Sequence, residues 1–134
     1  MGLFWASFSF TQKYEEKVNP MEIPQVVVEN QLIAYNEGDI DAFMAVFHQD
    51  IQVYHYGNET PIAEGWDNVR AIYADLFQKS PNLHSTLLNR TVIGNKVLDY
   101  EYIVGRAGSD EPLFLVMIYE IKDGKIYKAT SIRE

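Results

Sequence analysis

The sequence contains no cysteine, which excludes disulfide frameworks, thiolate zinc sites and cysteine nucleophiles. It also lacks any hydrophobic run near the roughly 18–20 apolar residues of a membrane-spanning helix. Basic residues are absent from positions 18–69, which hold nine carboxylates, whereas residues 70–134 hold nine bases and eight acids. With a net charge of −8 and no run of Lys or Arg, the chain is not expected to bind nucleic acid.

The 134 residues, 47% of them hydrophobic, correspond to one domain with enough apolar side chains for a core. The N-terminal residues MGLFWASFSF have no basic segment and no clear cleavage site, so we expect no signal peptide and a cytoplasmic protein. Residues 1–21 form either an N-terminal arm, packed on the body or on a neighbouring subunit, or an extension of little consequence. The domain itself is predicted to cover residues 22–134.

Hydrophobic spacing and turn signals predict helices first and a sheet afterwards. Asp39 follows a glycine stop and caps the second helix, which carries Phe47 in its apolar stripe and His48 near its end. Helices are predicted over residues 26–35, after Asp39, and over 66–77, and strands over 51–56, 85–93, 96–104, 113–121 and 125–132. Helices gathered on one side of an antiparallel sheet make an α+β domain.

Particular residues in this pattern are similar to a known superfamily. They are the segment AYNEGDIDAF at residues 34–43, the Glu64-Gly65 loop before a helix containing Tyr73, and DGKI at 123–126. With them the chain resembles the nuclear transport factor 2-like superfamily and, within it, the SnoaL-like, steroid isomerase-like proteins. The resemblance implies a curved antiparallel sheet wrapped around three N-terminal helices into a cone with a deep apolar pocket. The fold hosts isomerases, cyclases, dehydratases, epoxide hydrolases and binding proteins, so it does not specify an activity.

His55 is the first candidate for catalysis. By the period of two in a strand, it shares a face with Ile51 and Val53, so an ionisable ring points the same way as core side chains. A histidine can act as a base near neutral pH. In the ketosteroid isomerases the resemblance places the catalytic aspartate at this position, which implies a proton-transfer role for His55. The alternative is a histidine at the pocket rim that only hydrogen-bonds a neighbour.

The same resemblance argues against true 3-oxosteroid isomerisation. The oxyanion hole of those enzymes needs a tyrosine and a protonated acid, and their positions correspond here to Gln31 and Met117. Tyr73 matches a supporting tyrosine of that network, whereas Phe47 replaces the other one. Gln31 can still donate a weaker amide hydrogen bond.

A second charged group consists of Arg90, Asp99 and Glu101. If Gly94-Asn95 is the turn, residue 90 lies opposite 99 and residue 88 opposite 101, so all three side chains share one face. Two interpretations stay open. The trio lines the pocket and orients a polar substrate group or water, or it forms an ordinary cross-strand ion pair.

The remaining aromatic residues suggest binding surfaces. Tyr35 and Trp66 line the pocket mouth or belong to the core. Tyr100 and Tyr102 lie on the sheet face opposite the acids, and the resemblance implies a homodimer through that outer face.

These observations predict a small-molecule-binding SnoaL-like domain, with His55, Asp99 and Glu101 as catalytic candidates. Its reaction would be isomerisation, cyclisation, dehydration or hydration of a small apolar organic substrate, and His55→Ala would abolish it. No glycine-rich phosphate loop and no histidine–carboxylate ligand spacing occur, so neither a cofactor nor a metal is expected. The alternative is a non-enzymatic ligand-binding or dimeric interaction domain, in which Met117 and Phe47 fill the pocket.

Overall fold

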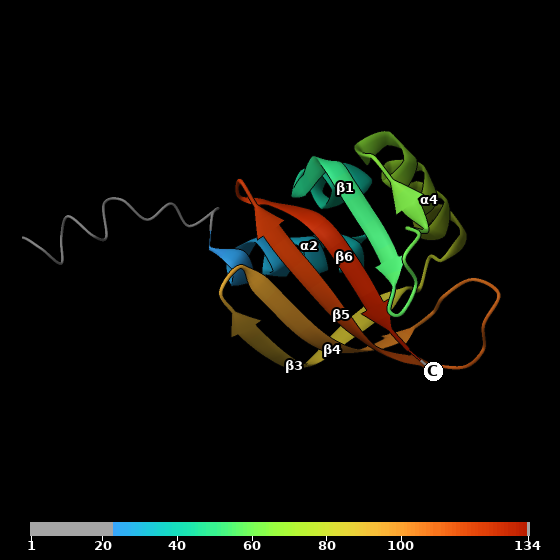
Figure 1. Cartoon of the computed structure of the whole chain (residues 1–134). Coiled ribbons are helices and arrows are strands. Elements are labelled where there is room, and N and C mark those ends of the chain that lie inside the picture. Colours follow the sequence, from blue (N-terminus) through green and yellow to red (C-terminus); the bar gives the residue numbers. More distant parts are fainter. Residues whose placement is uncertain (1–22, 134) are drawn as a thin grey trace, which may run out of the picture.

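The computed structural model describes residues 23–133, so the predicted N-terminal arm at residues 1–21 lies outside the described residues. The described elements follow one another in this order: α2 (Pro24–Glu37), α3 (Ile40–Met44), β1 (Phe47–His55), β2 (Ala63–Glu64), α4 (Trp66–Lys79), β3 (His84–Ile93), β4 (Lys96–Val104), β5 (Leu113–Lys122) and β6 (Lys125–Ile132). Figure 1 shows α2 behind the sheet and α4 beside β1. The predicted α+β fold class is confirmed.

Local signals set the helix boundaries. Gly38 ends α2 in the left-handed conformation at φ 66°, which a residue without Cβ adopts easily. Asp39 then caps α3, because its side chain accepts a hydrogen bond of 3.1 Å from the backbone N–H of Ala42. Both features agree with the sequence prediction. Within residues 23–133, no helix is long and apolar enough to cross a membrane.

The six strands form one curved, unclosed sheet in the order β2-β1-β6-β5-β4-β3. Neighbouring strands are antiparallel except for β1 and β6, which pair in parallel. This parallel pairing places His55 directly opposite Ser131. The short strand β2 lies in a segment that the sequence indicated as a loop.

Two sequence predictions about the second helix are wrong. The helix ends at Met44, and both Phe47 and His48 belong to β1. Pairing with β6 extends this strand backwards, since the Ile126 N–H donates to the Val46 carbonyl and Ile126 lies opposite Phe47. His48 is therefore not a helix-end cation, and its Nδ1 accepts a hydrogen bond from the Asp50 N–H at 3.0 Å.

The inner face of the sheet carries the core, and on β4 it carries two acids. Asp99 and Glu101 are buried beside Val97 and Ile103 on the same strand. The predicted pairing of Arg90 with Asp99 is confirmed. The register shifts between Leu87 and Asn89, however, so Glu101 lies opposite residue 87 rather than residue 88.

Candidate functional site

A cavity of about 370 Å³ lies between α2, α4 and the inner face of the sheet. Apolar side chains such as Val53, Val69, Leu115 and Met117 form part of its wall. Polar side chains also line it, and they come from every major element around it: Gln31, Tyr35, His55, Tyr73, Glu101, Tyr119 and Ser131, with Asp75, Lys79, Arg106 and Arg133 toward the exposed end.

Glu101 is the buried acid of this cavity. Its side chain projects inward from β4 with 4% of the residue exposed, and the Ser85 hydroxyl donates a hydrogen bond of 2.8 Å to its Oε1. Burial raises the pKa of Glu101 to about 7; the Ser85 hydrogen bond and the charge of Arg90 lower this pKa, while the charge of Asp99 raises it further. Glu101 can therefore both accept and donate a proton near neutral pH.

Ser85 is held in place by α2. The Asn36 side-chain amide donates to the Ser85 carbonyl at 2.9 Å, and the Ser85 N–H donates to the Asn36 Oδ1 at 2.7 Å. This reciprocal pair fixes β3 against the helix end. The Ser85 hydroxyl takes no part in this pair and donates to Glu101 instead.

Three tyrosines add neutral hydroxyl groups to the cavity. Burial raises the pKa values of Tyr35, Tyr73 and Tyr119, and the charge of Glu101 raises all three further, so the hydroxyls stay protonated and lie within electrostatic reach of that carboxyl group. None of the three hydroxyls forms a hydrogen bond within residues 23–133. They are available as donors to a bound molecule.

An aromatic cluster orients two of these tyrosines. The Phe43 ring lies 4.6 Å from the Tyr73 ring and 6.1 Å from the Tyr35 ring, measured between centroids. Phe77 packs edge-on against Tyr35 at 5.6 Å. Such ring contacts restrict the tyrosine rotamers, so the hydroxyl positions are set before any molecule binds.

Gln31 contributes an unused acceptor. Its residue is 5% exposed on the core-facing side of α2, it lines the cavity, and its Oε1 has no hydrogen-bond partner within residues 23–133. A buried carbonyl oxygen without a donor costs about 1–3 kcal/mol.

His55 is half-buried and also lines the cavity. Its Nδ1 is 2.8 Å from the Ser131 Oγ, and its Nε2 is 3.4 Å from a guanidinium nitrogen of Arg133. Because a guanidinium group can only donate, the Arg133 contact favours the tautomer with the proton on Nδ1, which then donates to Ser131. Nε2 is the basic nitrogen in that tautomer. His55 and Glu101 thus line the same cavity from the inner face of the sheet, on strands β1 and β4, which β6 and β5 separate.

Arg90 and Asp99 do not line the cavity. The Arg90 guanidinium makes two hydrogen bonds of 2.7 and 2.8 Å to the Asp99 carboxylate and a third of 2.8 Å to Glu29 on α2. Asp99 is 1% exposed. The predicted charged trio therefore divides: Arg90 and Asp99 join the sheet to α2, and only Glu101 faces the cavity.

Phe47 and Trp66 lie outside the cavity lining. For Phe47 this differs from the predicted substrate contact, whereas for Trp66 it agrees with the core position that was one of its two alternatives. Phe47 packs in the core, with its ring centroid 4.9 Å from that of Phe43. Trp66 donates from its indole nitrogen to the Met44 carbonyl at 3.0 Å and so holds the start of α4 against α3. Both are core contacts between neighbouring elements.

Six polar or charged lining residues escaped the sequence interpretation: Asp75, Lys79, Arg106, Tyr119, Ser131 and Arg133. Tyr119 had a usable signal, since it lies two residues beyond Met117 on the same face of β5. Ser131 had none, because it faces His55 only through the parallel pairing of β1 with β6. The two arginines lie just beyond strand ends, where periodicity carries no information.

The residues in and around the cavity do not form a metal centre. Within the described chain, residues 23–133, no group of three or more His, Asp or Glu side chains could hold a metal ion.

The fold and the cavity together define a class. A curved sheet that encloses a cavity against its helices is the cystatin-like, nuclear transport factor 2-like architecture. A SnoaL-like domain model matches residues 28–129, and the chain belongs to this family. No protein of curated function matches it by sequence.

Solved structures show the same fold. An uncharacterised cystatin-fold protein from Novosphingobium aromaticivorans has a TM-score of 0.75 at 23% identity, covering 87% of this chain and 99% of its own. A proposed ketosteroid isomerase from Kribbella flavida has a TM-score of 0.68 at 16% identity, and the match covers 86% of this chain and 78% of that protein. An LEH-like epoxide hydrolase from Mycobacterium tuberculosis has a TM-score of 0.67 at 17% identity, and the match covers 81% of this chain and 80% of that protein.

Proposed function

We propose that this protein is a cofactor-independent enzyme that moves a proton on a small, largely apolar organic substrate held in the cavity. The observation that carries the proposal is Glu101: a buried carboxyl group with a pKa of about 7 faces a cavity that also contains His55. Perturbed acids of this kind are concentrated at catalytic sites. The similarity of the fold to isomerase-like and epoxide hydrolase-like structures supports the same class of chemistry.

The expected chemistry is proton transfer beside a carbonyl group. The Glu101 carboxylate removes a proton from the carbon next to the carbonyl, and the electron pair of that C–H bond moves toward the carbonyl oxygen. The hydroxyl of Tyr73 or Tyr119 donates a hydrogen bond to this oxygen as negative charge develops. Glu101 or His55 then returns a proton to carbon, which completes an isomerisation or an exchange.

This arrangement differs from a 3-oxosteroid isomerase site, because Gln31 and Met117 occupy the positions that the resemblance assigned to its two donors. Tyr119, two residues further along β5, supplies a hydroxyl from the same face. The cavity volume of about 370 Å³ suits a one- or two-ring molecule.

Exchange of substrate protons for deuterium tests the proposal even though the natural substrate is not known. In D₂O, the wild-type protein should catalyse incorporation of deuterium at the carbon next to the carbonyl of 2-tetralone or a similar bicyclic or monocyclic ketone. NMR spectroscopy measures the rate of this incorporation. We expect Glu101→Gln and His55→Ala each to lower the catalysed rate by about 100-fold or more, since each removes an acid–base group.

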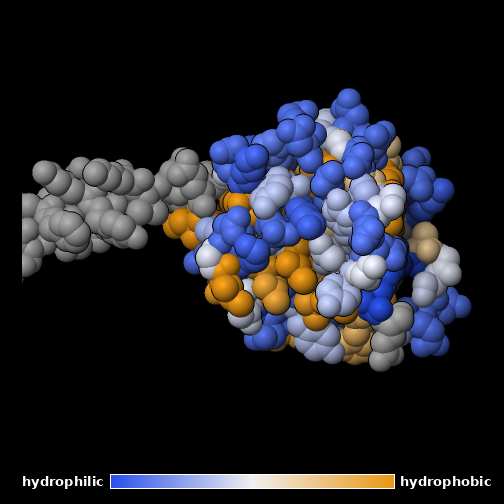
Figure 2. Space-filling view, viewed as in Figure 1, coloured by the Kyte–Doolittle hydropathy of each residue, from blue (hydrophilic) through white to orange (hydrophobic). Residues whose placement is uncertain are grey.

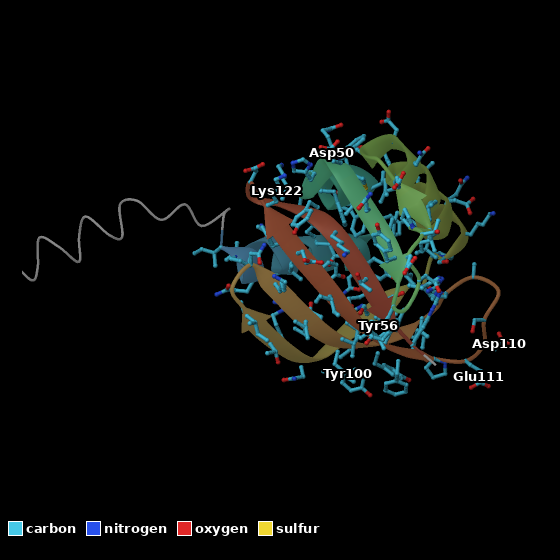
Figure 3. The ribbon with its side chains drawn as sticks, viewed as in Figure 1. Asp50, Tyr56, Tyr100, Asp110, Glu111 and Lys122 are labelled. Carbon is cyan, nitrogen blue, oxygen red and sulfur yellow. The ribbon has the colours of Figure 1, made fainter. Side chains whose placement is uncertain are left out.

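The matched controls are Glu111→Gln and His48→Ala. Glu111 is exposed at the outer end of the β4–β5 loop (Figure 3), and His48 lies on the same strand as His55 but outside the cavity. Both should keep the wild-type rate. Full activity in Glu101→Gln would refute the catalytic assignment, and no exchange above the buffer rate across the ketone panel would favour the non-enzymatic binding domain.

We also propose that a second copy of the chain covers the outer face of the sheet. Three cross-strand pairs between β4 and β5 place apolar or aromatic side chains there: Leu98–Ile118, Tyr100–Val116 and Tyr102–Phe114. Figure 2 shows apolar residues gathered over this part of the sheet, and Figure 3 shows Tyr100 pointing away from the helices. An exposed apolar patch of this kind is typical of an interface.

The dimer can be tested by sedimentation equilibrium. Phe114 is 51% exposed and its ring lies 4.9 Å from that of Tyr102. Phe114→Lys should shift a wild-type dimer to a monomer, because an ammonium group would be buried without a partner in the interface. Ile72→Lys, at an exposed position on α4, is the control and should leave the dimer intact. A monomeric wild-type protein would contradict the proposal.

A further inference from the structure

The exposed end of the cavity has an unusual excess of positive charge for so acidic a chain. Four charged side chains line this end: Asp75, Lys79, Arg106 and Arg133. Lys79 and Asp75 neutralise each other through an ion pair of 3.0 Å on α4. The guanidinium groups of Arg106 and Arg133 have no carboxylate within 4.0 Å among residues 23–133. Among residues 23–133, two cations without a carboxylate partner thus lie at the mouth of a cavity in a protein of net charge −8.

Arg106 is held at the mouth by its neighbours in the chain. Gly105 has φ 79°, and a Cβ built there would lie 2.1 Å from the Asn82 carbonyl oxygen, so only glycine allows the loop to approach the α4–β3 turn this closely. On the other side of Arg106, the Ala107 N–H donates to the Ser80 Oγ at 2.9 Å. The loop backbone is therefore fixed on both sides of this arginine.

Arg133 reaches the same cavity from a different strand. It directly follows β6, and its guanidinium lies 3.4 Å from the His55 Nε2 at the edge of the cavity. Burial, followed by the charge of Glu101, raises the pKa of Tyr73, whereas the positive charges of Arg106 and Arg133 lower it. Both guanidinium groups therefore act on the same hydroxyl, and they flank one end of one cavity.

The nearby acids among residues 23–133 do not cancel this charge. Asp110 and Glu111, on the same loop as Arg106, lie at its outer end and outside the cavity lining (Figure 3). Glu101 is the remaining acid in the cavity, and it is buried with a pKa of about 7, so it carries only part of a negative charge at neutral pH. A planar guanidinium group forms its strongest contacts with a carboxylate, often through two parallel hydrogen bonds.

We propose that the natural ligand of this cavity is a small carboxylic acid, with its carboxylate bound between Arg106 and Arg133 and its apolar ring body inside. This inference rests on the proposed function, because it concerns the same cavity, and it adds the class of substrate. The inner end fits such a body, because apolar side chains such as Val69, Ile103 and Leu115 line the cavity.

A matched pair of probes tests this inference. Calorimetric titration of the full chain with 2-naphthoate and with 2-naphthamide compares one ring system with and without a negative charge. We expect the wild-type protein to bind the acid about tenfold more tightly than the amide, as one to two charge-assisted hydrogen bonds would give. Raising the salt concentration should weaken binding of the acid and leave binding of the amide unchanged.

The variants Arg106→Gln and Arg133→Gln should each reduce the preference for the acid, and the double variant should abolish it while it still binds the amide. Arg70→Gln is the matched control, since Arg70 pairs with Asp41 at 2.7 Å and lies outside the cavity lining. It should bind like the wild type. Circular dichroism confirms that each variant is folded.

Two results would overturn the inference. Equal affinity of the wild type for acid and amide would show that the cavity binds small molecules without selecting an acid. A preference that survives in the double variant would show that other groups recognise the carboxylate. If neither probe binds, both the inference and the small-molecule function that it rests on are wrong.

Discussion

Replacing Arg90 with Met should lower the free energy of unfolding by about 3–5 kcal/mol, the typical cost of removing one partner from a buried ion pair. The substitution leaves Asp99, which is 1% exposed, as an isolated carboxylate within the core. It also breaks the contact between β3 and α2 that runs through Glu29. Urea denaturation at pH 7 measures the effect.

The control for this prediction is Arg70→Met. Arg70 also forms an ion pair, at 2.7 Å to Asp41, but both side chains are substantially exposed. Such a pair contributes about 0–1 kcal/mol. A second variant, Arg90→Met with Asp99→Asn, should regain part of the stability, because the buried charge has been removed as well. A loss in Arg90→Met no larger than in Arg70→Met would show that the cluster is not a structural ion pair.

The free energy of unfolding of Glu101→Gln should increase relative to that of the wild-type protein as the pH rises. The pKa of Glu101 is about 7 in the folded protein against an ordinary value of 4.5, so between these pH values the native state keeps a proton that the unfolded chain has released. The stability that this proton contributes to the wild-type protein is fully present below about pH 4.5. It is lost as the pH rises through the folded-state pKa of about 7. The total change is about 3 kcal/mol from pH 4 to pH 8. Glutamine carries no such proton.

Urea denaturation of both proteins across this range provides the measurement. The Gln side chain can still accept the hydrogen bond from Ser85, so the comparison isolates the charge. Glu111→Gln, in the exposed loop, should show no comparable rise over the wild type. A constant difference between Glu101→Gln and the wild type would mean that burial does not raise the pKa of Glu101. The same variant that loses catalysis should then be the more stable protein, as is common for strained active sites.

Much of the fold could be predicted because its signals are local. Gly38 and Asp39 separate the first two helices through conformations and hydrogen bonds that involve only a few neighbouring residues. The turn at Gly94-Asn95 fixes the pairing of Arg90 with Asp99 in the same way. Strand pairing across long distances gave no such signal, so the extension of β1 back to Phe47 was not predicted.

The candidate site was predictable only in part, for the same reason. Period two placed His55 on the face of the core side chains and put Asp99 and Glu101 together on one face, but it did not decide which face the two acids occupy and could not separate Asp99 from Glu101. These two acids point the same way from one strand, yet one lies under α2 with Arg90 and the other opens into the cavity. Their different surroundings come from α2 and from the bulge in β3, which are features of the assembled domain.

The parallel pairing of β1 with β6 also has a consequence for how the domain folds. His55 and Ser131 are 76 residues apart in sequence, and the strands that carry them are adjacent only when β6 has inserted between β1 and β5. Contacts of such high sequence separation form slowly, because the entropy of closing a long loop must be overcome first. We therefore expect the hairpins β3–β4 and β5–β6 to form before the cavity is complete. A partly folded chain that has not joined β6 to β1 would contain both hairpins and still lack the wall on which His55, Ser131 and Arg133 meet.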